Sequence, residues 1–133
     1  MILFDTNALL RFLLQDDEEK ALFVRERMSL HAFLIPVEVV AEMVYVLSKV
    51  YQVDRQRIAK ELYRLLNAPN AVAQNQKVVE FVLEIFAETK LDFVDCIIVG
   101  YAKSENVQII TFDKKLKKQL DIEITNCESF TKQ

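Results

Sequence analysis

The 133-residue sequence contains very little glycine and histidine, and each shortage excludes a class of site. Its single glycine, Gly100, is too few for a P-loop or a dinucleotide-binding fingerprint, because both cradle phosphates with several glycines. It also excludes the nucleophile elbow, which needs two. The single histidine, His31, excludes zinc sites built from several histidines. Ser-His-Asp or Cys-His catalysis would depend on His31 alone, and we expect that residue to be structural or exposed.

Cysteines and long apolar runs are scarce as well. Two cysteines, Cys96 and Cys127, do not make a disulfide framework, and this predicts a reducing, cytoplasmic setting. No apolar run approaches the roughly 20 residues that span a bilayer. The N-terminus shows no basic segment ahead of an apolar one, so we expect neither a signal peptide nor a membrane partner.

The length predicts a single domain over residues 1–133 that is large enough to bury a core. The composition, with 52% hydrophobic and 28% charged residues, is that of a soluble globular protein. The net charge of −3 and the pI of about 5.2 argue, on their own, against nucleic acid as a partner. Two divalent cations bound to a cluster of acids would bring the net charge from −3 to +1, however. The overall charge therefore leaves nucleic-acid binding open.

Short apolar runs alternate with helical patterns along the chain. Strands are predicted at 1–4, 32–36, 71–74, 107–112 and 122–126, and helices at 6–15, 16–30, 37–51, 54–67, 76–89, 92–106 and 113–120. The predicted helix N-caps are Asp16 or Asp17, Asp54, Asn75 and Asp92. This alternation is typical of an α/β fold with a parallel sheet covered on both faces.

Two carboxylates follow directly on predicted strands. Asp5 ends "ILF-D" and Asp113 ends "IITF-D". Sites in open α/β sheets form outside the carboxyl ends of the strands, so the two acids share one rim if their strands are neighbours. The alternative is that each acid is simply the N-cap of the helix that follows.

A third carboxylate, Glu42, lies on the predicted helix 37–51, which is apolar nearly all round. At 100° per residue, Glu38, Glu42, Tyr45 and Lys49 form one narrow polar stripe. A carboxylate on a mostly buried helix must find water, a cation or a metal, because burying it bare is costly. The stripe is either a thin solvent edge or part of a site, and Glu38 lies one turn before Glu42 and is an alternative ligand.

The fourth candidate, Asp95, stands between Val94 and Cys96 in an otherwise apolar run. Asp92 is explained as an N-cap with Asp95 at the third helical position, as in a capping box, but this accounts less well for Asp95. Like charges repel, and a cluster of acids persists when a divalent cation neutralises it. Carboxylate oxygens favour Mg²⁺ or Mn²⁺.

Four segments then resemble a known family. The stretches "ILFDTNALLRFLLQDD", "VEVVAEMVYVLSKVY", "LDFVDCIIVGYA" and "IITFD" are similar, in order and spacing, to the four blocks of PIN-domain ribonucleases, most of all the VapC-type toxins of bacterial toxin–antitoxin pairs. The resemblance runs from the first residue to about Leu120. It implies a three-layer α/β/α sandwich with a central parallel sheet. It also implies endonucleolytic cleavage of RNA with one or two Mg²⁺ or Mn²⁺ ions.

The resemblance also implies roles for individual residues. The metal-binding, catalytic acids are matched by Asp5, Glu42, Asp95 and Asp113, of which Asp113 occupies the position that varies most in such proteins. The polar residues that surround these acids are matched by Thr6, Asn7 and Thr111. Glu38 and Asp92 are candidates for additional ligands. Candidate RNA contacts are Arg11, Lys114 and Lys115, although the lysine run is otherwise a solvated helix face.

The partners implied by the resemblance are RNA, a cognate antitoxin protein and a second copy of the chain in a homodimer. A housekeeping PIN-domain RNA-processing nuclease would have the same sequence pattern. A catalytically silent PIN-like RNA-binding module is a further alternative, against which the presence of all four acids argues. A phosphatase of the haloacid dehalogenase type also places Asp after its first strand, but it needs a second Asp two residues on, where Asn7 stands.

Overall fold

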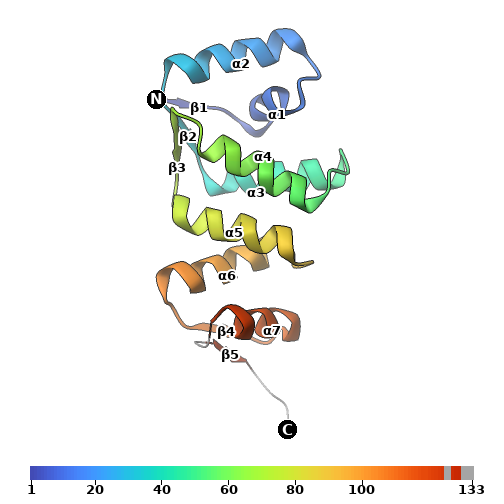
Figure 1. Cartoon of the computed structure of the whole chain (residues 1–133), viewed down its shortest axis with the longest axis vertical. Helices are drawn as coiled ribbons and strands as arrows, with labels where there is room; N and C mark the ends of the chain where they lie inside the picture. The colour runs from blue at the N-terminus through green and yellow to red at the C-terminus, as the bar shows by residue number, and fades with distance from the viewer. Residues whose placement is uncertain (125–126, 130–133) are drawn as a thin grey trace. The chain divides into compact units, whose positions relative to one another are not determined.

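The chain forms two compact units, Met1–Gln76 and Lys77–Gln133, which are described separately (Figure 1). The structure is a computed structural model that describes the backbone of residues 1–124 and 127–129 and the side chains as far as residue 124. No helix among these residues has the length and apolar character that crossing a membrane requires.

The first unit is built on a parallel sheet with the strand order β1-β2-β3. Its strands are β1 (Ile2–Leu3), β2 (Phe33–Ile35) and β3 (Ala71–Ala73). The register pairs Ile2 with Phe33 and Phe33 with Ala71. In the central strand β2, Phe33 and Ile35 point to the same face of the sheet and are both fully buried, whereas Leu34, on the opposite face, is half-buried.

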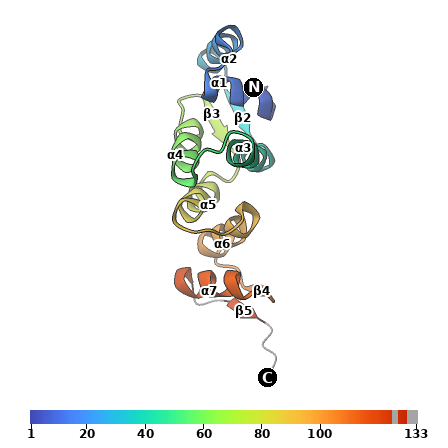
Figure 2. The same cartoon turned by 90° about the vertical axis from the view of Figure 1, so that its right-hand side faces the viewer.

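Four helices complete this unit: α1 (Thr6–Leu14), α2 (Glu18–Leu30), α3 (Val37–Lys49) and α4 (Arg55–Leu66). Helix α1 packs against α2 and α3, and α3 packs against α4, as Figure 2 shows. The largest side chains that these helices bury completely are Leu9, Val40, Met43, Ile58, Leu62 and Leu66. Burying each one stabilises the fold by about 1.5–3 kcal/mol, before the entropy of ordering it is subtracted.

Side-chain hydrogen bonds set the ends of these helices. Asp17 accepts a hydrogen bond from the Lys20 N–H and Asp54 one from the Arg57 N–H, so both are N-caps. This confirms the prediction for Asp54 and decides between Asp16 and Asp17, which the sequence left open. At the other end of α2, the Asn70 amide donates to the backbone oxygens of Met28 and Ser29 at 2.8 and 3.2 Å. These bonds tie the last turn of α2 to the segment that leads into β3.

The second unit contains α5 (Gln76–Glu88, of which Gln76 is the last residue of the first unit), α6 (Phe93–Glu105), β4 (Ile109–Thr111), α7 (Lys114–Glu123) and β5 (Cys127–Ser129). Strands β4 and β5 are parallel. Helix α6 lies between α5 and α7 in both views (Figures 1 and 2).

The single glycine lies where α6 approaches α5 closely. A Cβ at Gly100 would stand 2.5 Å from Val82 Cγ2 and 3.2 Å from the Val78 carbonyl oxygen. Val82 is itself fully buried. Helix-interior glycine is intrinsically unfavourable, so its use here follows from this close approach of the two helices.

The parallel α/β character of the chain is confirmed, whereas the last strand is misplaced and the capping of α6 is predicted only in part. The strand predicted at 122–126 is displaced: Ile122 and Glu123 end α7, and β5 begins at Cys127. Residues 125 and 126 lie outside the described residues. Asp92 does precede α6, but its side chain makes no capping hydrogen bond.

Candidate active site

Asp5 lies between β1 and α1, where the backbone changes from extended to helical. Its φ and ψ of −74° and 172° are those of an N-cap residue, and its Oδ1 accepts a hydrogen bond from the Ala8 N–H at 2.8 Å. The capping interpretation of Asp5 is therefore correct. An ionised carboxylate has about four lone-pair sites on two oxygens, so a cap bond to Oδ1 leaves Oδ2 able to bind a cation. The side chain is exposed.

The next residue, Thr6, connects this turn to α3. Of the side chains that the structure describes, Thr6 is the polar one that is buried, with 6% of its surface exposed. Its Oγ1 donates a hydrogen bond to Glu42 Oε2 at 3.0 Å, across 36 residues of sequence. This bond fixes one oxygen of Glu42 next to the residue that follows Asp5. The bond thus attaches Glu42 to the first turn of α1, the helix that Asp5 caps.

The polar stripe of α3 is found as the sequence predicts. Glu38, Glu42, Tyr45 and Lys49 are all exposed, while Val40, Met43, Val44 and Leu47 are buried. The stripe is therefore the solvent-exposed edge of a buried helix. Glu42 is the member of this stripe that Thr6 holds.

Three acids of the second unit influence one another electrostatically. Asp95 is half-buried in the first turn of α6. Burial raises the pKa of Asp95 above its ordinary value, and the negative charges of Asp113 and Asp92 raise it further. This combination of partial burial and neighbouring like charge is the one that a divalent cation relieves.

Asp113 follows β4 as Asp5 follows β1. Its Oδ1 accepts a hydrogen bond from the Leu116 N–H at 3.0 Å, which makes it the N-cap of α7. Its own N–H donates to Thr111 Oγ1 at 3.0 Å. Thr111, the last residue of β4, therefore helps to fix the turn that carries Asp113.

The donor set fits a hard divalent cation, because every candidate ligand is a carboxylate oxygen. Within either unit, no three His, Cys, Asp or Glu side chains of the described residues converge into a complete metal-binding group. Mg²⁺ keeps several waters and takes only one or two carboxylates from a protein, so a pair of acids matches its needs. Asp5 with Glu42, and Asp95 with Asp113, are such pairs.

The candidate RNA-binding cations differ in their surroundings. Arg11 forms an ion pair with Asp16 at 2.7 Å and donates a hydrogen bond to the Tyr51 hydroxyl at 3.1 Å. The Tyr51 hydrogen bond is the main reason that the pKa of Arg11 is raised above its ordinary value. Lys114 and Lys115 are exposed at the start of α7, which agrees with a solvated helix face.

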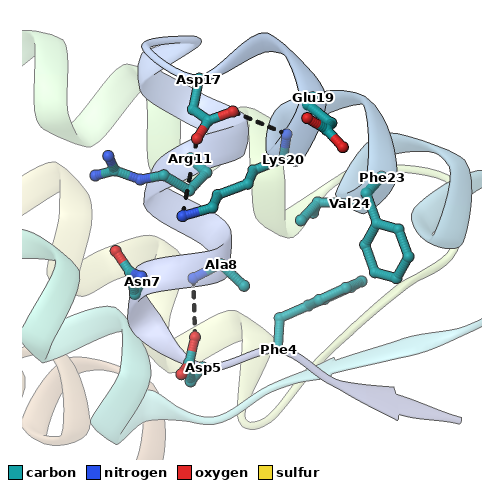
Figure 3. A pocket seen from close by; sticks show the side chains of 10 residues that line it. All are labelled: Phe4, Asp5, Asn7, Ala8, Arg11, Asp17, Glu19, Lys20, Phe23 and Val24. Atoms are coloured by element: carbon teal, nitrogen blue, oxygen red, sulfur yellow. Dashed lines mark hydrogen bonds and ion pairs between the residues drawn. The ribbon is translucent and has the colours of Figure 1, made fainter.

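The sequence patterns did not reveal a cavity beside Asp5. Its volume is about 520 Å³, and residues of α1 and α2 line it, among them Asn7, Lys20 and Phe23 (Figure 3). The only hint in the sequence was Phe23, an aromatic residue in a helix without a clear apolar face. Its ring is 56% exposed.

Comparisons with known proteins place this geometry in context. The model of the PIN domain family matches residues 2–119. Over 123 residues the chain is 24% identical to a protein of Aquifex aeolicus (strain VF5) named "VapC ribonuclease". The alignment covers 89% of this chain and 91% of that protein.

Proposed function

The chain belongs to the PIN-domain family, a three-layer α/β/α fold, and from this premise we propose that it is a metal-dependent endoribonuclease that serves as the toxin of a type II toxin–antitoxin system. One observation carries the proposal: the family match over residues 2–119 spans all four candidate acids. The similarity to a VapC ribonuclease over nearly the full length of both chains supports the toxin assignment.

In this proposal the acids act as ligands of one or two Mg²⁺ or Mn²⁺ ions. The proposed ligands are Asp5, Glu42, Asp95 and Asp113, with Glu38 and Asp92 as candidates for additional contacts. The ion, when bound, supplies acidity to a water molecule and neutralises charge on the phosphodiester. Support for this comes from the carboxylate-only donor set and from the partial burial of Asp95 beside Asp113 and Asp92, which raises the pKa of Asp95.

Other side chains have positioning or binding roles in this proposal. Thr6 orients Glu42 through the 3.0 Å hydrogen bond, and Thr111 holds the turn of Asp113. Asn7 is exposed on the first turn of α1, next to Asp5. Lys114 and Lys115 are placed to meet phosphates close to Asp113, because they follow it directly at the N-terminus of α7.

The partners in this proposal are RNA, a cognate antitoxin and a second copy of the chain, in the cytoplasm. Co-purification of a small protein encoded beside this chain, with loss of RNA cleavage in the complex, is the expected sign of an antitoxin. A housekeeping RNA-processing nuclease would lack that partner.

The decisive experiment compares RNA cleavage by wild-type protein, Asp5→Asn and Asp54→Asn, with Mg²⁺, Mn²⁺ or EDTA. Asp54 is a matched control because it caps α4 through the same kind of hydrogen bond that Asp5 makes. Asparagine caps helices about as well as aspartate, so neither change should unfold the protein. We expect Asp5→Asn to lower the cleavage rate of a mixed-sequence single-stranded RNA by at least about 100-fold. EDTA should have a similar effect, and Asp54→Asn should leave cleavage unchanged. Equal activity of both variants would show that Asp5 is only a cap.

A further inference from the structure

The cavity beside Asp5 has the dimensions of a small-ligand site. Its volume of about 520 Å³ lies within the range of about 300–1,000 Å³ that such sites occupy. Its apolar wall comes from Phe4, Phe23 and Val24. Its polar lining consists of the amide of Asn7, the two cations Arg11 and Lys20, and the three acids Asp5, Asp17 and Glu19. Asp5 lies at one edge, where its carboxylate and its cap bond to Ala8 are visible in Figure 3.

The ring of Phe23 is available to a ligand. Its exposed fraction is 56%, whereas Phe4 is 7% exposed and packs edge-to-face on Phe33. The guanidinium of Arg27 lies 4.4 Å from the centre of the Phe23 ring and covers one face of it. Phe23 and Phe4 both line the cavity, and Figure 3 draws their side chains at the same end of it. Such an aromatic platform suits a flat, apolar group such as a nucleobase.

Lys20 is one of two cations that line the cavity, the other being Arg11. Its side chain is 66% exposed, and its amine lies 3.8 Å from Asp17 Oδ2, a long and weak ion pair. The amine extends from α2 toward α1 in Figure 3. Asp17 is already engaged as the N-cap of α2, and Arg11 is engaged with Asp16. Of the two cations that line the cavity, Lys20 has the longer ion pair and is therefore the more available to a phosphate.

We infer that this cavity is a nucleotide subsite for single-stranded RNA, in which one base stacks on Phe23 while its phosphate contacts Lys20. The inference rests on the proposed ribonuclease function and assigns the place of a nucleotide close to the bond that is cut. The combination of an aromatic ring, a loosely paired amine and the neighbouring Asp5 favours RNA over a purely apolar segment of a protein, which would make no use of the amine.

The test measures RNA affinity separately from cleavage. A fluorescein-labelled, mixed-sequence single-stranded RNA is titrated with the Asp95→Asn protein in Mg²⁺, and its anisotropy gives the Kd. Phe23→Ala in that background should weaken binding by about fivefold or more, and Phe23→Tyr should restore it. Lys20→Met should reduce the slope of log K against log salt by about 0.7, the effect of one phosphate contact on a single strand.

The controls are variants of the same type outside the cavity. Leu22→Ala truncates an apolar side chain that is 51% exposed on the same helix, and Lys60→Met removes an exposed lysine of α4. Both should bind RNA like the parent. Circular dichroism melting should show that Phe23→Ala stays folded, because its ring is largely exposed.

The outcomes separate this inference from the proposed function. If the wild-type protein cuts RNA and Phe23→Ala binds as tightly as its parent, the subsite is refuted and the nuclease stands. If Phe23→Ala and Leu22→Ala weaken binding equally, the effect is unspecific and the subsite is again refuted. If the wild-type protein binds RNA through Phe23 and Lys20 but never cuts it, the subsite stands and the nuclease proposal fails.

Discussion

Replacing Thr6 by valine tests whether the buried hydroxyl positions Glu42 for metal binding. Valine has the shape of threonine and is also β-branched, so the first turn of α1 is expected to form as before. The change removes the 3.0 Å hydrogen bond from Thr6 Oγ1 to Glu42 Oε2 and little else. Stability and activity should therefore respond very differently.

The expected change in stability is small because two effects oppose each other. A lost hydrogen bond costs about 0.5–1.5 kcal/mol, and water partly replaces it because Glu42 is exposed. Burying a methyl group in place of a hydroxyl gains up to about 0.8 kcal/mol at a position that is only 6% exposed. The free energy of unfolding should therefore change by less than about 1 kcal/mol, or about 4 °C in Tm. By contrast, removing a group that orients a metal ligand lowers metal affinity or activity by about 10- to 100-fold.

Three assays decide the matter: urea unfolding, calorimetric titration with Mn²⁺ and cleavage of single-stranded RNA. Thr6→Ser keeps the hydroxyl and should recover most of the metal affinity that Thr6→Val loses. The reasoning is refuted if Thr6→Val binds Mn²⁺ and cuts RNA within about twofold of the wild-type protein, since an orienting bond is worth more than that. It is also refuted if Thr6→Ser fails as badly as Thr6→Val, because the methyl group would then be the part that matters.

Three further predictions concern stability. Asp95→Asn should abolish cleavage yet raise the free energy of unfolding at pH 7 by up to about 1 kcal/mol, because the raised pKa of Asp95 means that folding disfavours its charge. The excess in the free energy of unfolding of Asp95→Asn over the wild-type protein, measured in urea, should grow as pH rises through the raised pKa and disappear below the ordinary value near 3.8. An excess that is independent of pH would contradict the electrostatic cause. Gly100→Ala should destabilise the protein by about 1–3 kcal/mol, and Val82→Ala in the same chain should recover part of this; additive losses would argue against the contact. Asn70→Ala should cost about 1–2 kcal/mol by removing its two hydrogen bonds to α2 carbonyls, and an unchanged Tm would show that water replaces them.

The elements of the fold were predictable from the sequence wherever a local pattern determines them. Apolar periodicity located the helices. Asp54 marked the start of α4 correctly, and Asp16 or Asp17 the start of α2 to within one residue, because a capping side chain acts within three residues. The last strand was misplaced because "IEIT" alternates like a strand, whereas Ile122 and Glu123 continue α7 in the structure. Glu123 accepts hydrogen bonds from Gln119, one turn before it, and from Lys103 of α6. The bond from Lys103 joins residues 20 apart in sequence, so no local pattern registers it.

For the candidate site, the sequence indicated which types of side chain are present better than which of them contact one another. The stripe of α3 followed from helix geometry, and its exposure agrees with that prediction. The hydrogen bond between Thr6 and Glu42 joins residues 36 apart, so no local pattern predicts it. The cavity beside Asp5 was missed for the same reason, since α1 and α2 create it only by packing together.

Asp5 and Asp113 each combine the role of a helix N-cap with the role of metal ligand that we propose for them. Each caps a helix through one oxygen, where the positive end of the helix dipole stabilises a carboxylate by about 0.3–1 kcal/mol. Asp95 lies in the first turn of α6, but burial and two neighbouring acids outweigh any such benefit and raise its pKa. Asparagine preserves a cap but neither the charge nor the affinity for a cation. Its substitution for a capping acid and for the half-buried Asp95 should therefore change stability differently. Asp5→Asn should lose activity with little change in stability, whereas Asp95→Asn should lose activity and gain stability. That contrast is expected if helix ends stabilise the charges of Asp5 and Asp113, whereas only a bound cation would stabilise the charge of Asp95.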